Sequence, residues 1–268
     1  MKRTFSAGVF LIILLAALAT PPTAPAQEQA LADPFARLET LTAQAESGGI
    51  EAQRDLGLYY LFTLQDGTSA LPWLEKAAAR GDAPSQTAMG YLYEEGIGTA
   101  VDLKKAIAFY EQAANQDHPV AQSRLGYLLK SGAAGKKDLA SAAKWLQRAA
   151  SWGDAYAQAN LAEMFEKGMG IAQNYSLAAT WYSAAAAQSH TLAQRGLGRL
   201  YENGQGVRKD LVKAYMWYSI AGVWDSVGED ELPPDDPRRR LRKTMTPKQI
   251  LEAEALATDW WIEHFQPK

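Results

Sequence analysis

Aromatic and small residues recur along the chain with a constant step of 36 residues. One aromatic position per copy is occupied by Trp73, Phe109, Trp145, Trp181 and Trp217. A second series with the same step places a small residue directly after Met or Leu, at Gly90, Gly126, Ala162 and Gly198. Coincident series with one period indicate five copies of a single structural unit. The first copy is three residues shorter, and the loss falls between Tyr60 and Asp66.

Each copy is expected to form two α-helices. In the second helix of the second copy, apolar residues at i, i+3, i+4, i+7 and i+8 share one face, from Ala106 to Ala114. Glycines are placed to end the first helices, as at Gly96, Gly132, Gly168 and Gly204, and aspartates to cap the second, at Asp102, Asp138 and Asp210. The glycine inside the first helices, replaced by Ala162 in the fourth copy, lowers helix propensity, so we expect it to permit a close approach of the partner helix.

One helical pair cannot bury its aromatic face alone, so successive pairs must stack. We therefore expect an all-α fold, a right-handed α/α solenoid of five helical hairpins over residues 46–226. An N-terminal capping helix is expected within 27–45, beginning at Asp33-Pro34. Residues 227–268 should form an acidic loop and two capping helices, which begin at Asp236-Pro237 and Thr246-Pro247. Pro72 would lie inside a second helix unless that helix begins late, with Thr68 or Ser69 as its cap.

The first 26 residues have the pattern of a secretory signal peptide. Lys2 and Arg3 precede an apolar stretch over 5–19, and a Pro-rich run ends at Ala24-Pro25-Ala26. The apolar stretch is shorter than the roughly 20 residues that a membrane-spanning helix needs. We expect cleavage after Ala26 and a periplasmic or secreted protein without a stable membrane span. The alternative is a signal that is retained as a membrane anchor.

Charge and cysteine content exclude several classes of partner and of functional site. The chain has 27 Lys+Arg against 30 Asp+Glu, and its net charge of −3 becomes −5 once Lys2 and Arg3 are removed. A nucleic-acid-binding protein would normally be basic, so no nucleic-acid partner is expected. The absence of cysteine in the sequence excludes disulfides, thiolate metal sites and cysteine nucleophiles. An exported protein of this kind must derive its stability from stacking.

The fifth copy carries a resemblance to a known family, through Leu197-Gly198, Tyr201, Gly204-Gln-Gly206-Val207, Asp210, Lys213-Ala214, Trp217-Tyr218 and Ala221. These residues resemble the Sel-1-like repeat of the tetratricopeptide-like α/α superhelices, and residues 245–253 resemble the C-terminal cap of exported bacterial members. The resemblance implies a non-enzymatic scaffold or adaptor that binds a protein or peptide partner in the cell envelope without a cofactor. Regulation of an envelope complex or a sensor kinase is one such role.

By analogy with tetratricopeptide arrays, the first helices are expected to line a concave partner-binding face. The residues expected on that face are Thr87, Tyr91, Glu94, Glu95, Ser123, Tyr127, Lys130, Glu163, Glu166, Arg195, Arg199 and Glu202. Their mixed charge would suit a partner of mixed charge, whereas the alternative is a merely solvated surface. A series of glutamines in the same helices is interpreted as structural, and it consists of Gln53, Gln86, Gln122, Gln158 and Gln194.

A charged segment near the end of the chain is a second candidate for docking. Six acidic residues between Asp225 and Asp236 are followed at once by Arg238, Arg239, Arg240, Arg242 and Lys243. Opposed charges of this kind could bind a charged partner. The alternative is a solvated loop followed by an exposed helix face.

Signals for catalysis or metal binding are weak. Ser141 and Lys144 have the S-x-x-K spacing of penicillin-recognising enzymes, but the companion S-D-N and K-T-G motifs are missing. His118 and His190 fall two copies apart in equivalent turns, which leaves only His264. We expect no catalytic residue and no metal site. The alternatives are a cell-wall or β-lactam-acting enzyme, and a glycan-binding module that uses surface Tyr and Trp.

Overall fold

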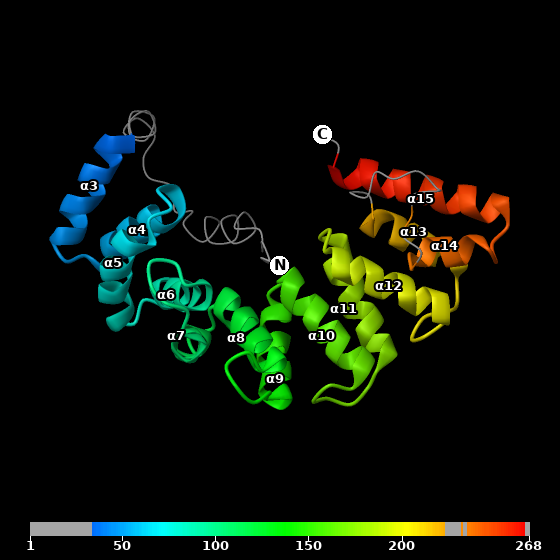
Figure 1. Cartoon of the computed structure of the whole chain (residues 1–268), viewed down its shortest axis with the longest axis horizontal. Helices are drawn as coiled ribbons and strands as arrows, with labels where there is room; N and C mark the ends of the chain where they lie inside the picture. The colour runs from blue at the N-terminus through cyan, green and yellow to red at the C-terminus, as the bar shows by residue number, and fades with distance from the viewer. Residues whose placement is uncertain (1–33, 223–231, 233–234, 266–268) are drawn as a thin grey trace. The chain divides into compact units, whose positions relative to one another are not determined.

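The computed structural model describes residues 34–222, 232 and 235–265. The predicted signal peptide and most of the acidic loop lie outside these residues. Within them the chain forms thirteen α-helices and one π-helix and no strand, so the all-α prediction is confirmed (Figure 1). None of these helices combines the length and the apolar character needed to cross a membrane. The chain divides into two compact units, Met1–Leu125 and Gly126–Lys268.

The first unit contains the N-terminal helix and the first two helical pairs. Its elements are α3 (Pro34–Glu46), α4 (Ile50–Leu58), the π-helix η1 (Tyr59–Thr63), α5 (Gly67–Ala79), α6 (Ala83–Glu95), α7 (Leu103–Ala114) and the beginning of α8 (Pro119–Ser131). Helices that follow one another along the chain pack together, as α4 packs on α5 and α6 on α7. Their shared core includes Leu58, Leu74, Met89 and Leu92, all 4% exposed or less.

The shortened first copy departs from the others where α4 runs directly into η1. This π-helix takes the place of the glycine loop that follows the other first helices. Of the two alternatives for the next helix, the structure shows the one with proline in the interior, because α5 begins at Gly67 with Asp66 as its cap and contains Pro72. The Pro72 ring is exposed, but its missing N–H removes one helical hydrogen bond.

The second unit contains the remaining helical pairs and the C-terminal helices. Its elements are the rest of α8, α9 (Leu139–Ser151), α10 (Ala155–Lys167), α11 (Tyr175–Ala187), α12 (Thr191–Asn203), α13 (Leu211–Ala221), α14 (Pro237–Arg242) and α15 (Pro247–Phe265). The last core cluster joins Tyr215 and Tyr218 of α13 to Leu241 and Ala253. The two C-terminal helices therefore cover the last helical pair, as the sequence predicted.

The predicted helix ends are confirmed by their geometry. The side chains of Asp102, Asp138 and Asp210 accept hydrogen bonds from backbone N–H groups in the first turns of α7, α9 and α13. Gly204 ends α12 with φ 69°, in the left-handed region that a glycine adopts without strain. Thr246 and Gln249 form reciprocal capping hydrogen bonds at the start of α15.

The glycines inside the first helices make room for large side chains of the second helices. A Cβ atom at Gly90 would lie 2.7 Å from the ring of Tyr110, and one at Gly198 would lie 2.8 Å from Tyr218. Both distances are far shorter than a van der Waals contact. The predicted close approach is therefore confirmed, and it explains why these helices keep a residue of low helix propensity.

The glutamine series joins each helical pair to the one before it. Each side-chain amide donates to a carbonyl eight residues earlier, near the end of the preceding helix, over distances of 3.2–3.4 Å. Gln86 and Gln158 also accept hydrogen bonds from Gln116 and Gln188. Because a buried carbonyl without a partner is unfavourable, these bonds support the structural interpretation of the series.

Candidate partner-binding surface

The residues predicted for a concave face are distributed over both units. In the first unit they lie on α6, apart from Ser123 on α8, and in the second unit they lie on α8, α10 and α12. The structure brings several of them into hydrogen-bonded pairs inside each unit. These pairs, and the exposure of each side chain, decide which residues are free to meet a partner.

Four of the twelve predicted residues are largely buried, and for two of them the prediction needs correction. Thr87 is fully buried, where its hydroxyl bonds the Ala83 carbonyl at 2.9 Å and Nδ1 of His118 at 3.0 Å. Ser123 is 4% exposed. Neither side chain can contact a partner. Tyr91 and Glu166 are 9% and 8% exposed, so each presents only an edge to solvent.

A glutamate near the end of the first helix bonds a tyrosine of the second helix in three of the copies. Each tyrosine hydroxyl donates to a carboxylate sixteen residues earlier, in the pairs Tyr110–Glu94 (2.8 Å), Tyr182–Glu166 (2.8 Å) and Tyr218–Glu202 (2.9 Å). In the third copy the glutamate position is Lys130 and the tyrosine position is Leu146. Both partners change together, because lysine cannot accept the hydroxyl hydrogen bond.

The same glutamates are held by cations from the next copy or from α14. Arg124 lies 3.6 Å from Glu94, Arg199 lies 2.6 Å from Glu166, and Arg240 lies 2.7 Å from Glu202. In the third copy the sign is reversed, since Lys130 bonds Glu163 of the following copy. We call this series of four ion pairs the charge ladder.

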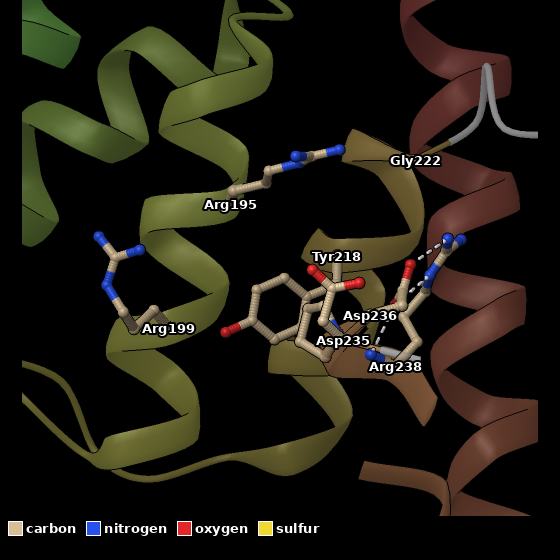
Figure 2. A pocket seen from close by; sticks show the side chains of 8 residues that line it. Arg195, Arg199, Tyr218, Gly222, Asp235, Asp236 and Arg238 are labelled. Carbon is tan, nitrogen blue, oxygen red and sulfur yellow. Dashed lines mark hydrogen bonds and ion pairs between the residues drawn. The ribbon is translucent and has the colours of Figure 1, made fainter. Parts of the chain in front are cut away.

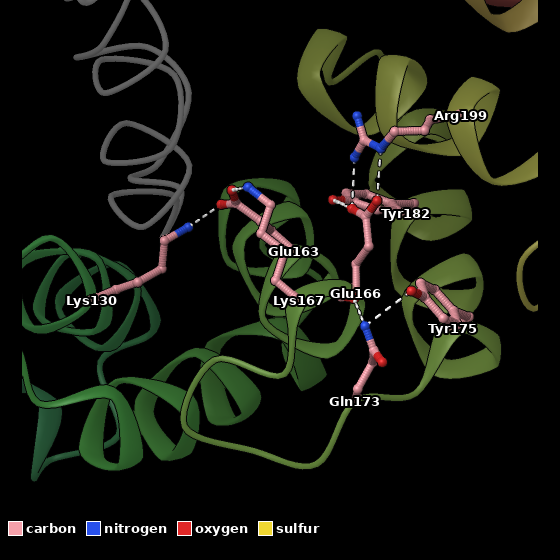
Figure 3. A network of polar contacts seen from close by, with 8 residues as sticks. All are labelled: Lys130, Glu163, Glu166, Lys167, Gln173, Tyr175, Tyr182 and Arg199. Atoms are coloured by element: carbon pink, nitrogen blue, oxygen red, sulfur yellow. Dashed lines mark hydrogen bonds and ion pairs between the residues drawn. The ribbon is translucent and has the colours of Figure 1, made fainter. Parts of the chain in front are cut away.

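Figure 3 shows two ion pairs of the charge ladder, Lys130–Glu163 and Arg199–Glu166, in which both carboxylates lie on α10. Glu163 accepts hydrogen bonds from Lys130 and from Lys167, which is 2.6 Å away. Glu166 accepts two hydrogen bonds from the Arg199 guanidinium, at 2.6 and 2.7 Å. This two-point arrangement fixes the orientation of the arginine as well as its position.

The pKa values of these groups follow from their contacts. Burial opposes ionisation of Glu163, but the hydrogen bonds from Lys130 and Lys167 prevail and lower its pKa to about 2. Burial likewise raises the pKa of Glu166, but the hydrogen bonds from Arg199 and Tyr182 outweigh this effect, so that the pKa is lowered. Burial raises the pKa of Tyr182, and the neighbouring Glu166 raises it further. Glu163 and Glu166 are thus ionised at neutral pH, and Tyr182 is neutral. In the first unit the balance differs, because burial raises the pKa of Glu94 despite Arg124 and the Tyr110 hydroxyl.

The predicted basic docking segment is largely bonded inside the chain. Arg238 makes two hydrogen bonds to Asp236, at 2.7 and 3.0 Å, and is 8% exposed. Arg240 bonds Glu202, and Arg242 bonds Glu254 at 2.8 Å and the Tyr215 hydroxyl at 2.6 Å. These contacts fasten α14 to α12, α13 and α15. Arg239 and Lys243 are exposed on the surface, and Arg239 donates a hydrogen bond of 3.4 Å to the Leu232 carbonyl.

A pocket of about 330 Å³ lies between α12, the end of α13 and the start of α14. Figure 2 shows Arg195 extending from α12 toward Gly222, on the other side of the pocket from Asp235 and Asp236. Asp236 is committed to Arg238. Within the described part of the chain, Arg195 and Asp235 form neither an ion pair nor a hydrogen bond. The pocket therefore offers one cation and one carboxylate that make no direct bond within the described residues, although the Arg195 charge helps to lower the pKa of Asp236.

The residues weighed for catalysis occupy structural positions. The Ser141 backbone N–H donates to the capping Asp138, and Lys144 is exposed one turn later. His190 caps α12, since its Nδ1 accepts from the Ala193 N–H. The described residues contain no cluster of three or more His, Cys, Asp or Glu that could hold a metal ion.

Stacked helical pairs joined by the glutamine series and the charge ladder define a helical-repeat protein of the tetratricopeptide-like class. The Sel1 repeat pattern matches five consecutive segments, residues 50–82, 83–118, 119–154, 155–190 and 191–222. The chain belongs to the Sel1 repeat family. The matched repeats begin and end slightly inside the predicted span of 46–226, and proteins built from them generally act as scaffolds for protein interactions.

Two solved structures resemble this chain closely enough to compare. One is c5321, a protective antigen of uropathogenic Escherichia coli, with 30% identity and a TM-score of 0.75 over 85% of this chain. The other is a Sel1 repeat protein from Oxalobacter formigenes, with 27% identity and a TM-score of 0.62 over 80% of this chain and 93% of its own. Both support a Sel1 repeat solenoid.

The relatives are longer than this chain in two cases. The chain spans 48% of the c5321 chain. It is also 37% identical over 81 residues to chitin synthase regulatory factor 3 of Schizosaccharomyces pombe, a match that covers 28% of this chain and 9% of that protein.

Proposed function

We propose that this protein is an exported, non-enzymatic adaptor that binds a partner protein of the cell envelope through the surface of its first helices. The scaffold role of Sel1 repeat proteins supports the adaptor part of the proposal. The basic, apolar and small-residue pattern of the first 26 residues supports export, with cleavage after Ala26. The domain limits proposed with it are 1–26, 27–45, 46–226 and 227–268.

The two charges of the α12 pocket that make no direct bond carry the proposal. Arg199 and Arg238 are both paired with carboxylates of this chain. Arg195 is exposed and makes no ion pair or hydrogen bond among the described residues, although its charge helps to lower the pKa of Asp236. A guanidinium that points into a pocket can bind a carboxylate with two hydrogen bonds. Asp235 across the pocket can take a basic group. The pair suits a peptide segment that carries both charges.

Site-specific photocrosslinking in intact cells tests this proposal. A photocrosslinking amino acid at position 195 should capture one envelope protein, whereas the same group at Thr180, which is exposed on α11, should not. Arg195→Glu should weaken binding of the captured protein by at least tenfold, since a repulsive charge replaces an attractive one. Arg208→Glu makes the same charge change on the loop after α12 and should leave binding unchanged.

Glycan binding is a second candidate, because Trp152 at the end of α9 is 66% exposed. Exposed aromatic rings can stack on apolar faces of other molecules. Co-sedimentation with peptidoglycan or polysaccharide tests this alternative. The adaptor proposal is wrong if position 195 captures no protein and if the wild-type protein co-sediments with the glycan whereas Trp152→Ala does not.

A further inference from the structure

The C-terminal helix α15 is apolar on both of its faces. One face packs against α13, where Ala253 and Ala257 are buried and the Trp260 ring meets Trp217 edge to face at 6.0 Å. The terminal helix of a repeat array normally presents a polar outer face, because nothing stacks beyond it. In α15 the outer face does not follow this rule.

The outer face carries a stripe of four apolar residues interrupted by one threonine, whose hydroxyl is bonded to the Glu254 carbonyl of the same helix. Its positions alternate steps of four and three along the helix, and the stripe consists of Leu251, Ala255, Thr258, Ile262 and Phe265. Leu251 is 67% exposed, Ile262 is 42% exposed and Phe265 is 48% exposed. At 100° per residue this stripe lies opposite the buried alanines. Alternating steps of four and three form the seam by which one helix packs along another.

Carboxylates line one edge of the stripe. Glu252, Asp259 and Glu263 fall on the same side of it and are exposed. Within the described residues none of the three makes an ion pair. Glu254, by contrast, lies on the other side of the stripe and is already paired with Arg242. The free negative edge therefore favours a partner with a positive edge.

We propose that the outer face of α15 binds an amphipathic helix of a partner protein, with leucine-type residues on the stripe and lysine or arginine along the acidic edge. A second copy of this chain fits the face less well. Antiparallel pairing of two α15 helices would bring their acidic edges together, and like charges across such a seam repel. The surface is separate from the first-helix face, so the two proposals stand or fall independently.

Two synthetic helical peptides are suitable probes. Both carry leucines at the seam positions, and they differ only in whether lysine or glutamate flanks the seam. The purified protein should bind the lysine-edged peptide at least tenfold more tightly than the glutamate-edged one, as measured by fluorescence anisotropy at low salt.

Variants of the protein locate the binding to α15. Leu251→Glu with Ile262→Glu should reduce binding of the lysine-edged peptide by at least tenfold, because two charges then occupy the apolar seam. Leu192→Glu is the matched control, since Leu192 on α12 is also 67% exposed, and it should change nothing. Circular dichroism before and after each substitution checks that the fold is retained.

Charge reversal gives the sharpest outcome. Glu252→Lys with Asp259→Lys and Glu263→Lys should invert the preference toward the glutamate-edged peptide. Binding that ignores the edge charges, or that survives the seam substitutions, would overturn the proposal. Self-association of the wild-type chain in analytical ultracentrifugation, abolished by the seam substitutions, would also overturn it by assigning the face to a second copy.

Discussion

The residue at position 130 differs from its equivalents in the other copies, and the residues that it pairs with differ accordingly. It stands where three other copies have glutamate, and its pairing partner is an acid rather than an arginine. The tyrosine that would bond a glutamate is replaced by Leu146 in the same copy. The change from a negative to a positive side chain at Lys130 is thus matched by Leu146 in the same repeat and by Glu163 in the next repeat.

The sequence alone could have revealed these pairs but not their consequences for binding. The positions of Lys130 and Leu146 vary together across the copies, which is a readable signal for contact. The burial of Thr87 is not readable in the same way, because it depends on His118 at the next helix start. Periodicity shows which residues share a face, but the tilt of the next helix decides how much of that face stays exposed.

His190 makes the stability of the second unit sensitive to mild acid. Burial lowers the pKa of His190, although Asp154 opposes this effect. Its Nδ1 accepts the Ala193 N–H at 3.4 Å, which only a neutral imidazole can do. The unfolded chain takes up the proton below a pH of about 6.5. The stabilising effect is therefore complete above that pH and is lost as the pH falls toward the lower pKa of the folded state.

Replacing His190 by aspartate should remove this acid sensitivity. Asp154 caps α10 from the equivalent position of the previous copy, so the substitution has a precedent in the chain. At pH 5.5 His190→Asp should be more stable than wild type by about 1 kcal/mol, the usual value of a helix cap. At pH 7.5 the difference should be smaller. Urea unfolding at both pH values measures it, and equal differences at the two would contradict the assignment.

At the scale of the element, helix positions and caps were largely predictable. Aspartate caps, glycine ends and the Thr246 start all act through residues within one turn, so a short sequence contains the whole signal. The start of α5 could not be decided from the sequence, because Asp66 and Pro72 give opposing signals. The cap prevailed, and the exposed ring of Pro72 is accommodated inside the helix.

The substitution Gly198→Ala tests whether helix propensity or packing dominates at this position, because the two have opposite effects on stability. Alanine is the better helix former by about 1 kcal/mol, so an unconstrained helix would be stabilised. Here the new Cβ would lie 2.8 Å from the Tyr218 ring, and that ring is held by Glu202. We expect a net loss of about 1–3 kcal/mol in the free energy of unfolding, which urea denaturation measures. A gain in stability would show that the helices can move apart freely.

At the scale of the whole molecule, neighbouring repeats provide the stability. Deleting residues 119–154 removes one matched repeat and joins His118 to Ala155. Because each repeat contacts only its neighbours, the shortened protein should remain helical, with unchanged ellipticity per residue in far-ultraviolet circular dichroism. It should also unfold at a lower urea concentration, since Glu94 loses Arg124 and Glu163 loses Lys130.

A substitution in the shortened protein tests whether the lost ion pairs, rather than a general disruption of the fold, cause the lower stability. Asn160 is the equivalent of Arg124 one copy later, so Asn160→Arg in the shortened protein gives Glu94 a new partner. It should restore up to about 1 kcal/mol, the usual limit for a partly exposed ion pair. The same substitution in the full-length protein should bring no gain. Loss of helical structure in the deletion itself would contradict independent stacking of the repeats.

The reversed sign at Lys130 also bears on how this chain can change in length over evolution. Repeat genes gain and lose copies by recombination between similar segments. Joining the third copy directly to the fifth would set Lys130 against Arg199, which takes the position of Glu163. Lys130 and Arg199 would repel each other at such a junction, whereas Lys130 and Glu163 attract each other in the present chain. We therefore expect the order of charges to make an array with rearranged repeats less stable than the present one.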